Sequence, residues 1–468
     1  MNKNNLLSQK PVILLSIETK AREFPGKVLL SCFLAEKGFR VILTNNRKES
    51  EVRKFSPWLF IDRNTFAPRL KFFKNLKRLA TRIVCLDEEG ILWYNPDQYR
   101  KRLNEKTNNL VDLYCTWGSK QTELVKEINK NSRVIETGNP RMDLFRPELR
   151  SIYQQKSDLL KAKYGEFILV VSNFSTNNYF YTKETDTPIL DVIIKQMYYQ
   201  GLITNREDED FVKGLYYNKL EVFEKLHKVI GYLSNRFPKM KIVVRPHPSE
   251  NHDVWKESMK NYSNVYVIFE GDLTSWILAS RVVIHNSCTS GLESALLNRK
   301  AIAFVPLDTP QYEQKLPNSV SAIAVNEKEV ADLVEKSPLV QIVPEVLNEY
   351  ISALSGSFAC ERITDAICEL YEKKQPLARI LLRRVLFASM SFFLFINRIK
   401  ELITSIGTRD IFKVRESKMN YLNQKFSGIT NEEVIEYIQI YSKLLKKFEN
   451  VKSAEVDGAF EIYNAYPD

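Results

Sequence analysis

The chain has 468 residues, 44% of them hydrophobic, which excludes a disordered protein and gives enough length for two domains and an appendage. Lysine and arginine outnumber the acidic residues by 68 − 57 = 11, which fits a nucleic acid, an anionic membrane surface or a phosphate-bearing substrate as partner. The six cysteines form no CxxC pair, and only four histidines are present, so we predict no metal site and a reducing, cytoplasmic compartment. We also expect no export signal, because the N-terminal residues lack a long apolar segment with a cleavage site.

The first 150 residues alternate short apolar runs with helical patterns. Residues 25–37 have helical spacing of their apolar side chains. Strands are predicted at residues 12–17, 40–43, 58–61, 83–86, 110–115 and 134–136. Such alternation favours a parallel sheet covered by helices on both faces.

A second series of the same kind occupies residues 151–373. A long helix is predicted at about 210–236. Strands are predicted at residues 167–171, 241–244, 265–269, 282–285 and 301–305. The fold class is therefore α/β, with two doubly wound Rossmann-like domains, 1–150 and 151–373, facing a cleft at the carboxyl ends of their strands.

Residues 374–468 are predicted to form a helical C-terminal extension. Within it, residues 378–402 surround an uncharged core, 385–397, that is too short to span a bilayer, and basic residues lie on both sides of that core. We interpret this segment as an interfacial helix on an anionic membrane leaflet. A helix that packs on the first domain is the alternative.

The sequence Arg245-Pro-His-Pro follows the strand predicted at 241–244. The two prolines restrict the backbone, so the ring of His247 is held in one direction, where it can donate to a phosphate oxygen of a departing nucleotide. Arg245 adds a permanent charge. A histidine that only completes a structural turn is the alternative.

A hydroxyl-rich loop follows the strand predicted at 282–285 and precedes a helix. The hydroxyls of Ser287, Thr289 and Ser290, with the first backbone N–H groups of the helix, can hold phosphate. Glu293, one turn further, can accept from the hydroxyls of a ribose. Without a ligand, Ser290 and Glu293 also match a helix-capping box.

Three adjacent carboxylates, Asp87, Glu88 and Glu89, follow the strand predicted at 83–86. Their mutual repulsion can raise the pKa of one of them and suit it as the general base that deprotonates an acceptor hydroxyl. An acidic, solvated turn is the alternative.

Weaker candidates also lie at predicted strand ends. They are expected to touch substrate or nucleotide, or to belong to ordinary turns. They are Arg22 and Glu23 after the first strand, Asn139 and Arg141 at the end of the first domain, and Ser172 and Asn173 after the first strand of the second domain.

Three motifs together resemble those of bacterial sialyltransferases and related transferases of CMP-activated keto-sugars: the acidic pair before Gly90, the pair His247-Pro248, and the serine-containing loop. Over about residues 10–370 the chain is also similar to the bacterial surface carbohydrate biosynthesis family, in its stretches TKAREFPGKVLL, LDEEG, GNPRMD, RPHPSE and NSCTSGLE. The resemblance implies a CMP-linked nonulosonate or Kdo donor, with Glu88 as the first choice of base, His247 and the serine loop as phosphate ligands, and Glu293 as the ribose ligand. The additional Asp87 and the separated serines depart from the sialyltransferase pattern, so the choice of base and of phosphate ligand stays open.

We therefore predict a GT-B-like, metal-independent glycosyltransferase without a cofactor. It would take a nucleotide sugar as donor and a bacterial surface glycan or glycolipid as acceptor, and lie on the inner face of the cytoplasmic membrane without contacting nucleic acid. Three other classes remain: a CDP-glycerol-type glycerophosphotransferase, which also uses an RPHP loop, a UDP-sugar 2-epimerase, and a non-catalytic nucleic-acid-binding protein.

Overall fold

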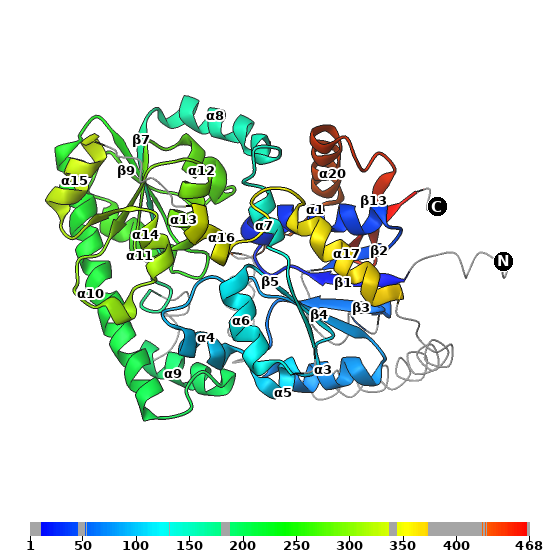
Figure 1. Ribbon diagram of the computed structural model, residues 1–468. Helices are drawn as coiled ribbons and strands as arrows, with labels where there is room; N and C mark the ends of the chain where they lie inside the picture. The colour runs from blue at the N-terminus through cyan, green and yellow to red at the C-terminus, as the bar shows by residue number, and fades with distance from the viewer. Residues whose placement is uncertain are drawn as a thin grey trace, which may run out of the picture. The chain divides into compact units, whose positions relative to one another are not determined.

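The computed structural model describes residues 11–44, 52, 54–130, 132–178, 188–336, 344–372, 424, 426 and 428–465. The chain divides into two compact units (Figure 1). Unit 1 comprises Met1–Gly90, Leu103–Leu144 and Asn348–Asp468, and unit 2 comprises Ile91–Arg102 and Phe145–Leu347.

Unit 1 is built on an eight-stranded sheet in the order β13-β14-β2-β1-β3-β4-β5-β6. Its six N-terminal strands are mutually parallel. They are β1 (Val12–Ser16), β2 (Arg40–Thr44), β3 (Leu59–Asp62), β4 (Arg82–Leu86), β5 (Leu113–Thr116) and β6 (Arg133–Glu136). The first five of these strands are buried along most of their length, as expected for a parallel sheet covered on both faces.

Helices cover both faces of this sheet. On one face lie α1 (Lys20–Glu36) and α17 (Ala359–Glu372), and on the other lie α3 (Arg69–Arg78) and α5 (Glu105–Asn108) (Figure 1). Helices α6 (Ser119–Ile128) and α7 (Pro140–Asp143) also belong to this unit. Helix α1 is buried almost throughout because α7, α17 and α20 (Asn431–Leu445) all pack against it.

The C-terminal segment differs from the predicted helical extension. After α20, the strands β13 (Val451–Val456) and β14 (Ala459–Asn464) form a hairpin, and β14 pairs antiparallel with β2. The hairpin is stabilised by burial of Ile462 and by an ion pair between Arg40 and Glu461. The proposed interfacial segment 378–402 lies outside the described residues.

Unit 2 is built on a six-stranded parallel sheet in the order β12-β11-β10-β7-β8-β9. Its strands are β7 (Phe167–Val171), β8 (Lys241–Arg245), β9 (Val265–Val267), β10 (Val282–His285), β11 (Ala301–Phe304) and β12 (Ala322–Ala324). Helices α8 (Gln154–Tyr164) and α12 (Leu273–Ala279) lie on one face, and α10 (Arg206–Arg236) and α15 (Glu327–Lys336) on the other (Figure 1). The core of this unit lies between the sheet and the apolar stripe of α10.

The remaining helices are short. They are α4 (Pro96–Arg102), α9 (Ile189–Gln200), α11 (His252–Met259), α13 (Thr289–Leu296), α14 (Lys315–Ser319) and α16 (Pro344–Tyr350), with 3-10 turns at Arg150–Tyr153 and Pro310–Tyr312.

The predicted α/β class with two doubly wound units is confirmed by these two sheets. The chain passes between the two units more often than the predicted boundaries at 150 and 373 imply. Residues Ile91–Arg102 belong to unit 2, and the segment with α17 returns to unit 1. A long-range contact holds that segment to unit 1, since the Asp143 carboxylate accepts the N–H groups of Ala359 and Cys360 at 2.8 and 2.9 Å and so caps α17.

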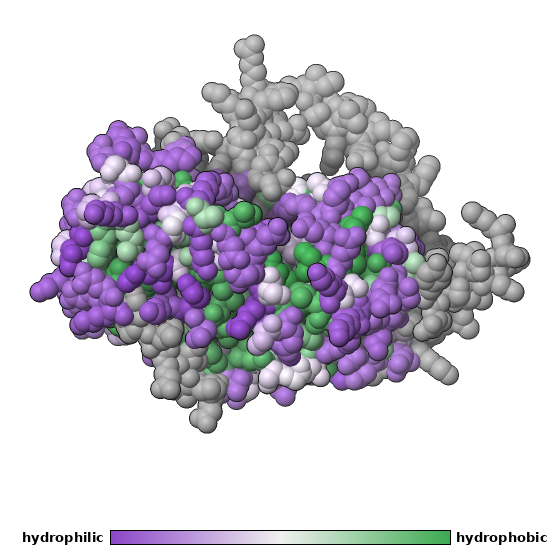
Figure 2. Space-filling model, turned by 90° about the horizontal axis from the view of Figure 1, so that it is seen from above, coloured by the Kyte–Doolittle hydropathy of each residue, from purple (hydrophilic) through white to green (hydrophobic). Residues whose placement is uncertain are grey.

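Apolar side chains are mostly inside the units. On the face shown in Figure 2, hydrophilic residues cover most of the described surface, and hydrophobic residues form smaller areas between them. None of the helices in the described part of the chain has the length and apolar character needed to cross a membrane.

Candidate functional site

The order of strands marks one position in each unit where a ligand can bind. In a doubly wound sheet this position lies at the carboxyl ends of the two neighbouring strands where the order reverses. In unit 2 these strands are β7 and β10, and in unit 1 they are β1 and β3. Most candidates from the sequence follow these strands or the adjacent β8 and β4.

In unit 2, the hydroxyl-rich loop connects β10 to α13. The N-cap of α13 is Cys288, whose side chain makes no capping hydrogen bond. Ser290 is 0% exposed, and its hydroxyl oxygen has no hydrogen-bond partner among the described residues. A capping box of Ser290 with Glu293 is therefore not formed, because Ser290 is already inside the helix. The N-terminus of α13 combines uncapped backbone N–H groups with a buried, unpartnered hydroxyl, which is an arrangement suited to an anion.

His285 lies beneath this loop and fixes its shape. Its Nδ1 accepts the N–H of Cys288 at 3.4 Å, and its Nε2 lies 2.9 Å from the Ser321 hydroxyl. Burial, together with the charge of Lys219, lowers the pKa of His285 to about 3, so the ring is neutral. The helix passes so close that a methyl group on Gly291 would come within 2.3 Å of His285 Nε2. This close approach accounts for glycine at that position.

Ser287 is hydrogen-bonded within the protein. Its φ of 44° is in the left-handed region, and its buried hydroxyl donates to the Glu313 carboxylate. Asn318 Nδ2 also lies 3.1 Å from this hydroxyl. Because its proton goes to Glu313, the Ser287 hydroxyl is occupied within the protein, whereas the Ser290 hydroxyl, predicted with it as a phosphate ligand, has no partner among the described residues. The phosphate contact of Ser287 stays a prediction. Thr289, half-buried at the first helical position, remains a candidate ligand.

Lys219 of α10 was not predicted from the sequence. It is 3% exposed, donates to the side-chain oxygen of Asn286, and lies 5.8 Å from the ring centroid of Phe174. Burial lowers the pKa of Lys219, against the opposing effect of the Glu313 charge. In the sequence, the burial of Lys219 is indicated by its place on the apolar stripe of α10, four residues after Leu215 and three before Val222.

The RPHP loop presents His247 after β8. The side chain is half-buried, and its Nδ1 accepts the N–H of Ser249 at 3.1 Å. Because Nδ1 is an acceptor, the neutral ring carries its proton on Nε2 and can donate it to a ligand oxygen. This geometry agrees with the predicted direction-fixing effect of the loop.

Glu250 holds the RPHP loop in place and is a second residue that the sequence analysis missed. Its carboxylate is 0% exposed and accepts from the Ser172 hydroxyl at 2.7 Å, the Phe174 N–H at 2.9 Å and the Trp255 indole at 2.7 Å. Burial raises the pKa of Glu250, although these hydrogen bonds oppose the rise. Glu250 therefore connects the loop after β8 to the end of β7. In the sequence, its role is indicated only by its position three residues after His247.

Arg245 and Ser172 both have hydrogen-bond partners within unit 2. The Arg245 guanidinium donates to the carbonyl oxygens of Glu270 and Gly271 at 2.7 and 2.6 Å and is 4% exposed. Burial lowers the pKa of Arg245 to about 10, so it stays charged at neutral pH, but its charge is directed into the fold. Ser172 is 1% exposed, and its hydroxyl donates to Glu250. The phosphate contacts of Arg245 and Ser172 stay predictions. Asn173, half-buried at the end of β7, is still available.

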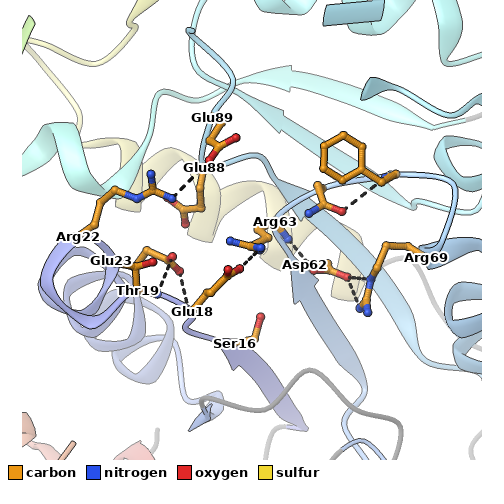
Figure 3. Close-up of polar contacts among 12 residues, drawn as sticks. Ser16, Glu18, Thr19, Arg22, Glu23, Asp62, Arg63, Arg69, Glu88 and Glu89 are labelled. Atoms are coloured by element: carbon orange, nitrogen blue, oxygen red, sulfur yellow. Dashed lines mark hydrogen bonds and ion pairs between the residues drawn. The ribbon is translucent and has the colours of Figure 1, made fainter. Parts of the chain in front are cut away.

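In unit 1, charged residues surround the carboxyl ends of β1, β3 and β4 (Figure 3). Glu18 pairs with Arg63, and the Asp62 carboxylate accepts from Arg69 Nε at 2.7 Å. Cations and carboxylates therefore alternate along this edge.

The most buried group on this edge is the triad Glu23, Lys27 and Glu88. The Lys27 ammonium lies 2.6 Å from Glu23 Oε2 and 3.2 Å from Glu88 Oε1, and donates to the Ser16 carbonyl at 2.6 Å. Burial alone would raise the pKa of Glu23, but the charge of Lys27 and hydrogen bonds, including one from the Thr19 N–H, hold it below its usual value. Burial alone would lower the pKa of Lys27, but Glu23 and Glu88 raise it above its usual value.

The three adjacent carboxylates have three different environments. Asp87 is 3% exposed and accepts the N–H of Glu89 at 3.0 Å, in a local turn. Glu88 pairs with Lys27, while Glu89 is half exposed and lies 3.9 Å from Arg22. Each of the three carboxylates therefore has its own partner, in place of the mutual repulsion that we expected among them. The sequence did not predict that Lys27 pairs with Glu88. Glu23 accepts the N–H of Thr19 at 3.0 Å and so holds the first turn of α1, and its contact with a substrate stays a prediction.

The stretch around Asn139 begins α7. Asn139, 1% exposed, accepts the N–H of Arg141 at 2.9 Å and caps α7. A methyl group on Gly26 of α1 would come within 3.2 Å of the Pro140 carbonyl, so this turn is in close contact with α1. The Asn139 side-chain oxygen therefore caps α7, whereas its Nδ2 is buried without a hydrogen-bond partner among the described residues. Its contact with substrate stays a prediction, and Arg141 is partly exposed beside it.

The sequence matches no protein-family model. No curated protein matches it either. Solved structures with similarity include a UDP-GlcNAc 2-epimerase of Methanocaldococcus jannaschii, at 11% identity and a TM-score of 0.46 over 76% of this chain and 99% of that one. They also include the UDP-GlcNAc 2-epimerase of Neisseria meningitidis, at 13% identity and a TM-score of 0.46 over 78% and 99%. A third is the wall teichoic acid polymerase TagF soaked with CDPG, at 12% identity and a TM-score of 0.46 over 80% and 92%. These comparisons show no link to a sialyltransferase or a Kdo transferase.

Proposed function

We propose that unit 2 binds the phosphate of a nucleotide-activated donor at the N-terminus of α13. The observation that carries this proposal is the buried Ser290 hydroxyl without a partner, in a helix whose N-cap residue provides no side-chain cap. Backbone N–H groups and a hydroxyl at a helix N-terminus neutralise a phosphate without a metal ion. The position at the strand-order reversal beside β7 supports the same conclusion.

We propose further that the chain is a transferase of bacterial surface glycan synthesis, as the motif resemblance implies. The acceptor hydroxyl attacks the donor, and the nucleotide leaves with the bonding electron pair. His247 Nε2 donates to the leaving phosphate, and the α13 N-terminus stabilises its charge. Glu88, whose ion pair with Lys27 fixes its position, is the first candidate to take the proton of the acceptor.

The donor distinguishes the enzyme classes that share this arrangement. UDP-GlcNAc, CDP-glycerol and CMP-Kdo are the donors to screen, because the similar solved structures and the motif resemblance name these three chemistries. Conversion of UDP-GlcNAc without any acceptor would identify a 2-epimerase instead of a transferase. Consumption of CDP-glycerol only in the presence of an acceptor would identify a glycerophosphotransferase.

The binding proposal is tested by calorimetric titration of the full chain with UDP, CDP and CMP. We expect at least one nucleotide to bind, and Ser290→Ala to bind it roughly tenfold or more weakly, because a hydrogen bond to a charged oxygen is lost. The matched control is Ser294→Ala, since the Ser294 hydroxyl is on the same helix but bonded to the Ser290 carbonyl at 2.6 Å. Binding of none of the three nucleotides, or equal binding by Ser290→Ala and wild type, would refute the proposal.

A further inference from the structure

A second polar group in unit 2, bonded to Asn286 and Ser287 of the loop that leads into α13, is left unexplained by phosphate binding. The segment after β11 folds back onto α10. Asn218 of α10 donates to the Thr309 hydroxyl, and Gly214 is so close to the Tyr312 hydroxyl that a side chain there would overlap it. This contact brings Glu313 towards Lys219, the next residue on α10 after Asn218.

Glu313 has one satisfied and one unsatisfied carboxylate oxygen. It is 6% exposed, and its Oε2 accepts from the Ser287 hydroxyl and from Asn318 Nδ2 at 3.3 Å. Its Oε1 is buried and has no hydrogen-bond partner among the described residues. A buried carboxylate oxygen without a donor is costly, so such an atom in a folded protein calls for a ligand or an ordered water.

Lys219 is the complementary case. Its ammonium carries three donor protons, and Asn286 is its only hydrogen-bond acceptor within the described part of unit 2. Glu313 is near enough for its charge to act on Lys219, yet the two form no ion pair of 4.0 Å or less. A buried donor and a buried acceptor therefore lie close to each other, each with unused hydrogen-bonding capacity.

The chemistry of this pair selects a hydroxyl group. A hydroxyl donates one hydrogen bond and accepts others, so a single oxygen can satisfy both Glu313 Oε1 and Lys219 Nζ. A phosphate would be repelled by the Glu313 carboxylate, and an ammonium group by Lys219. We propose that Lys219 and Glu313 bind a hydroxyl of the nucleotide-activated donor. This inference rests on the proposed function, because it assigns part of the same ligand.

The hydroxyl has two possible sources on such a donor: the ribose, and the group that is transferred. The experiment compares calorimetric affinities of the full-length wild type, Glu313→Ala and Lys219→Met for UDP and UDP-GlcNAc, and for CDP and CDP-glycerol. We expect both variants to lose affinity about tenfold or more, because each removes a hydrogen bond to a charged group. A loss confined to UDP-GlcNAc or CDP-glycerol assigns the hydroxyl to the transferred group, and an equal loss for UDP or CDP assigns it to the ribose.

Ser319→Ala is the matched control, because the Ser319 hydroxyl lies in the same segment but is bonded to the Leu316 carbonyl at 2.9 Å. Should Glu313→Ala fail to fold, Glu313→Gln, which keeps the shape and removes the charge, gives the same comparison. Unchanged affinities for all four ligands in folded variants would overturn the inference and assign the pair to an ordered water. Failure of wild type to bind any nucleotide would refute the proposed function instead, so the two failures are distinguishable.

Discussion

Replacing Lys27 by methionine tests how unit 1 holds its candidate base. Methionine keeps most of the length of the lysine stem but removes the ammonium that contacts Glu23, Glu88 and the Ser16 carbonyl. The triad has a net charge of −1 with Lys27 and −2 without it. Two carboxylates would then share a buried site with no cation between them.

The expected loss of stability is large. Removing one partner of a buried ion pair costs about 3–5 kcal/mol, and here the Lys27 and Glu23 side chains are only 5% and 0% exposed. The partly exposed pair Lys20–Glu433, with side chains 21% and 36% exposed, is the comparison. Lys20→Met should cost only ~0–1 kcal/mol, because solvent screens that pair.

The effect of Lys27→Met depends on pH in a defined direction. The folded-state pKa of Glu23 is lowered, so its contribution to stability is present above the ordinary value of 4.5 and is lost as pH falls through the folded value. The folded-state pKa of Lys27 is raised, so its contribution is present below 10.5 and is lost as pH rises through the folded value. The difference between wild type and variant should therefore be largest between about 4.5 and 10.5 and smaller at pH 4.

The assay is urea unfolding followed by far-ultraviolet circular dichroism at pH 7 and pH 4, for wild type, Lys27→Met, Lys20→Met and the double variant Glu23→Gln/Lys27→Met. We expect the double variant to recover part of the loss, because one uncompensated carboxylate is removed with the cation. A loss below 1 kcal/mol for Lys27→Met at pH 7, or the same loss at both pH values, would refute the account of the triad.

Two further predictions concern unit 2. Arg245→Met should lower the free energy of unfolding by roughly 1.5–3 kcal/mol, because the bonds to the Glu270 and Gly271 carbonyls are lost. The same variant should bind UDP within twofold of wild type by calorimetry, and a tenfold loss would support Arg245 as a phosphate ligand. The folded-state pKa of His285 is about 3, against an ordinary 6.5. The contribution of the neutral His285 to the free energy of unfolding is therefore complete above pH 6.5 and is lost as pH falls towards 3, by about 2 kcal/mol at pH 5. His285→Gln should remove this pH dependence from urea-unfolding curves, and an unchanged slope would contradict the neutral buried imidazole.

Local patterns were sufficient for most of the parallel strands. The apolar runs at 282–285, 167–171 and 40–43 coincide with β10, β7 and most of β2, because a strand buried on both faces is a continuous apolar run. The hairpin β13–β14 was missed for the opposite reason. Its residues are mostly exposed or half-buried in β13 and only partly buried in β14, so they form no continuous apolar run, and its pairing with β2 joins positions more than 400 residues apart.

The candidate sites show the same division between local and long-range information. The sequence located the strand-end loops with His247, Ser290 and Glu88. It did not show which side chains in those loops were already occupied, because their partners are distant in sequence: Ser287 with Glu313, Arg245 with Gly271, and Glu88 with Lys27. Lys219 and Glu313 lie within a helix and a loop that carry no motif, so only the fold brings them together.

The two units differ in the kind of ligand that their strand ends can accept. In unit 1 the basic residues at the strand ends already have carboxylate partners, with Arg63 beside Glu18 and Lys27 beside Glu23. A phosphate there would have to replace a carboxylate, and would gain little over the interaction it breaks. In unit 2 the N-terminus of α13 lacks a side-chain cap, so an anion there would displace no capping side chain. This difference supports the proposed phosphate contact on unit 2 rather than on unit 1.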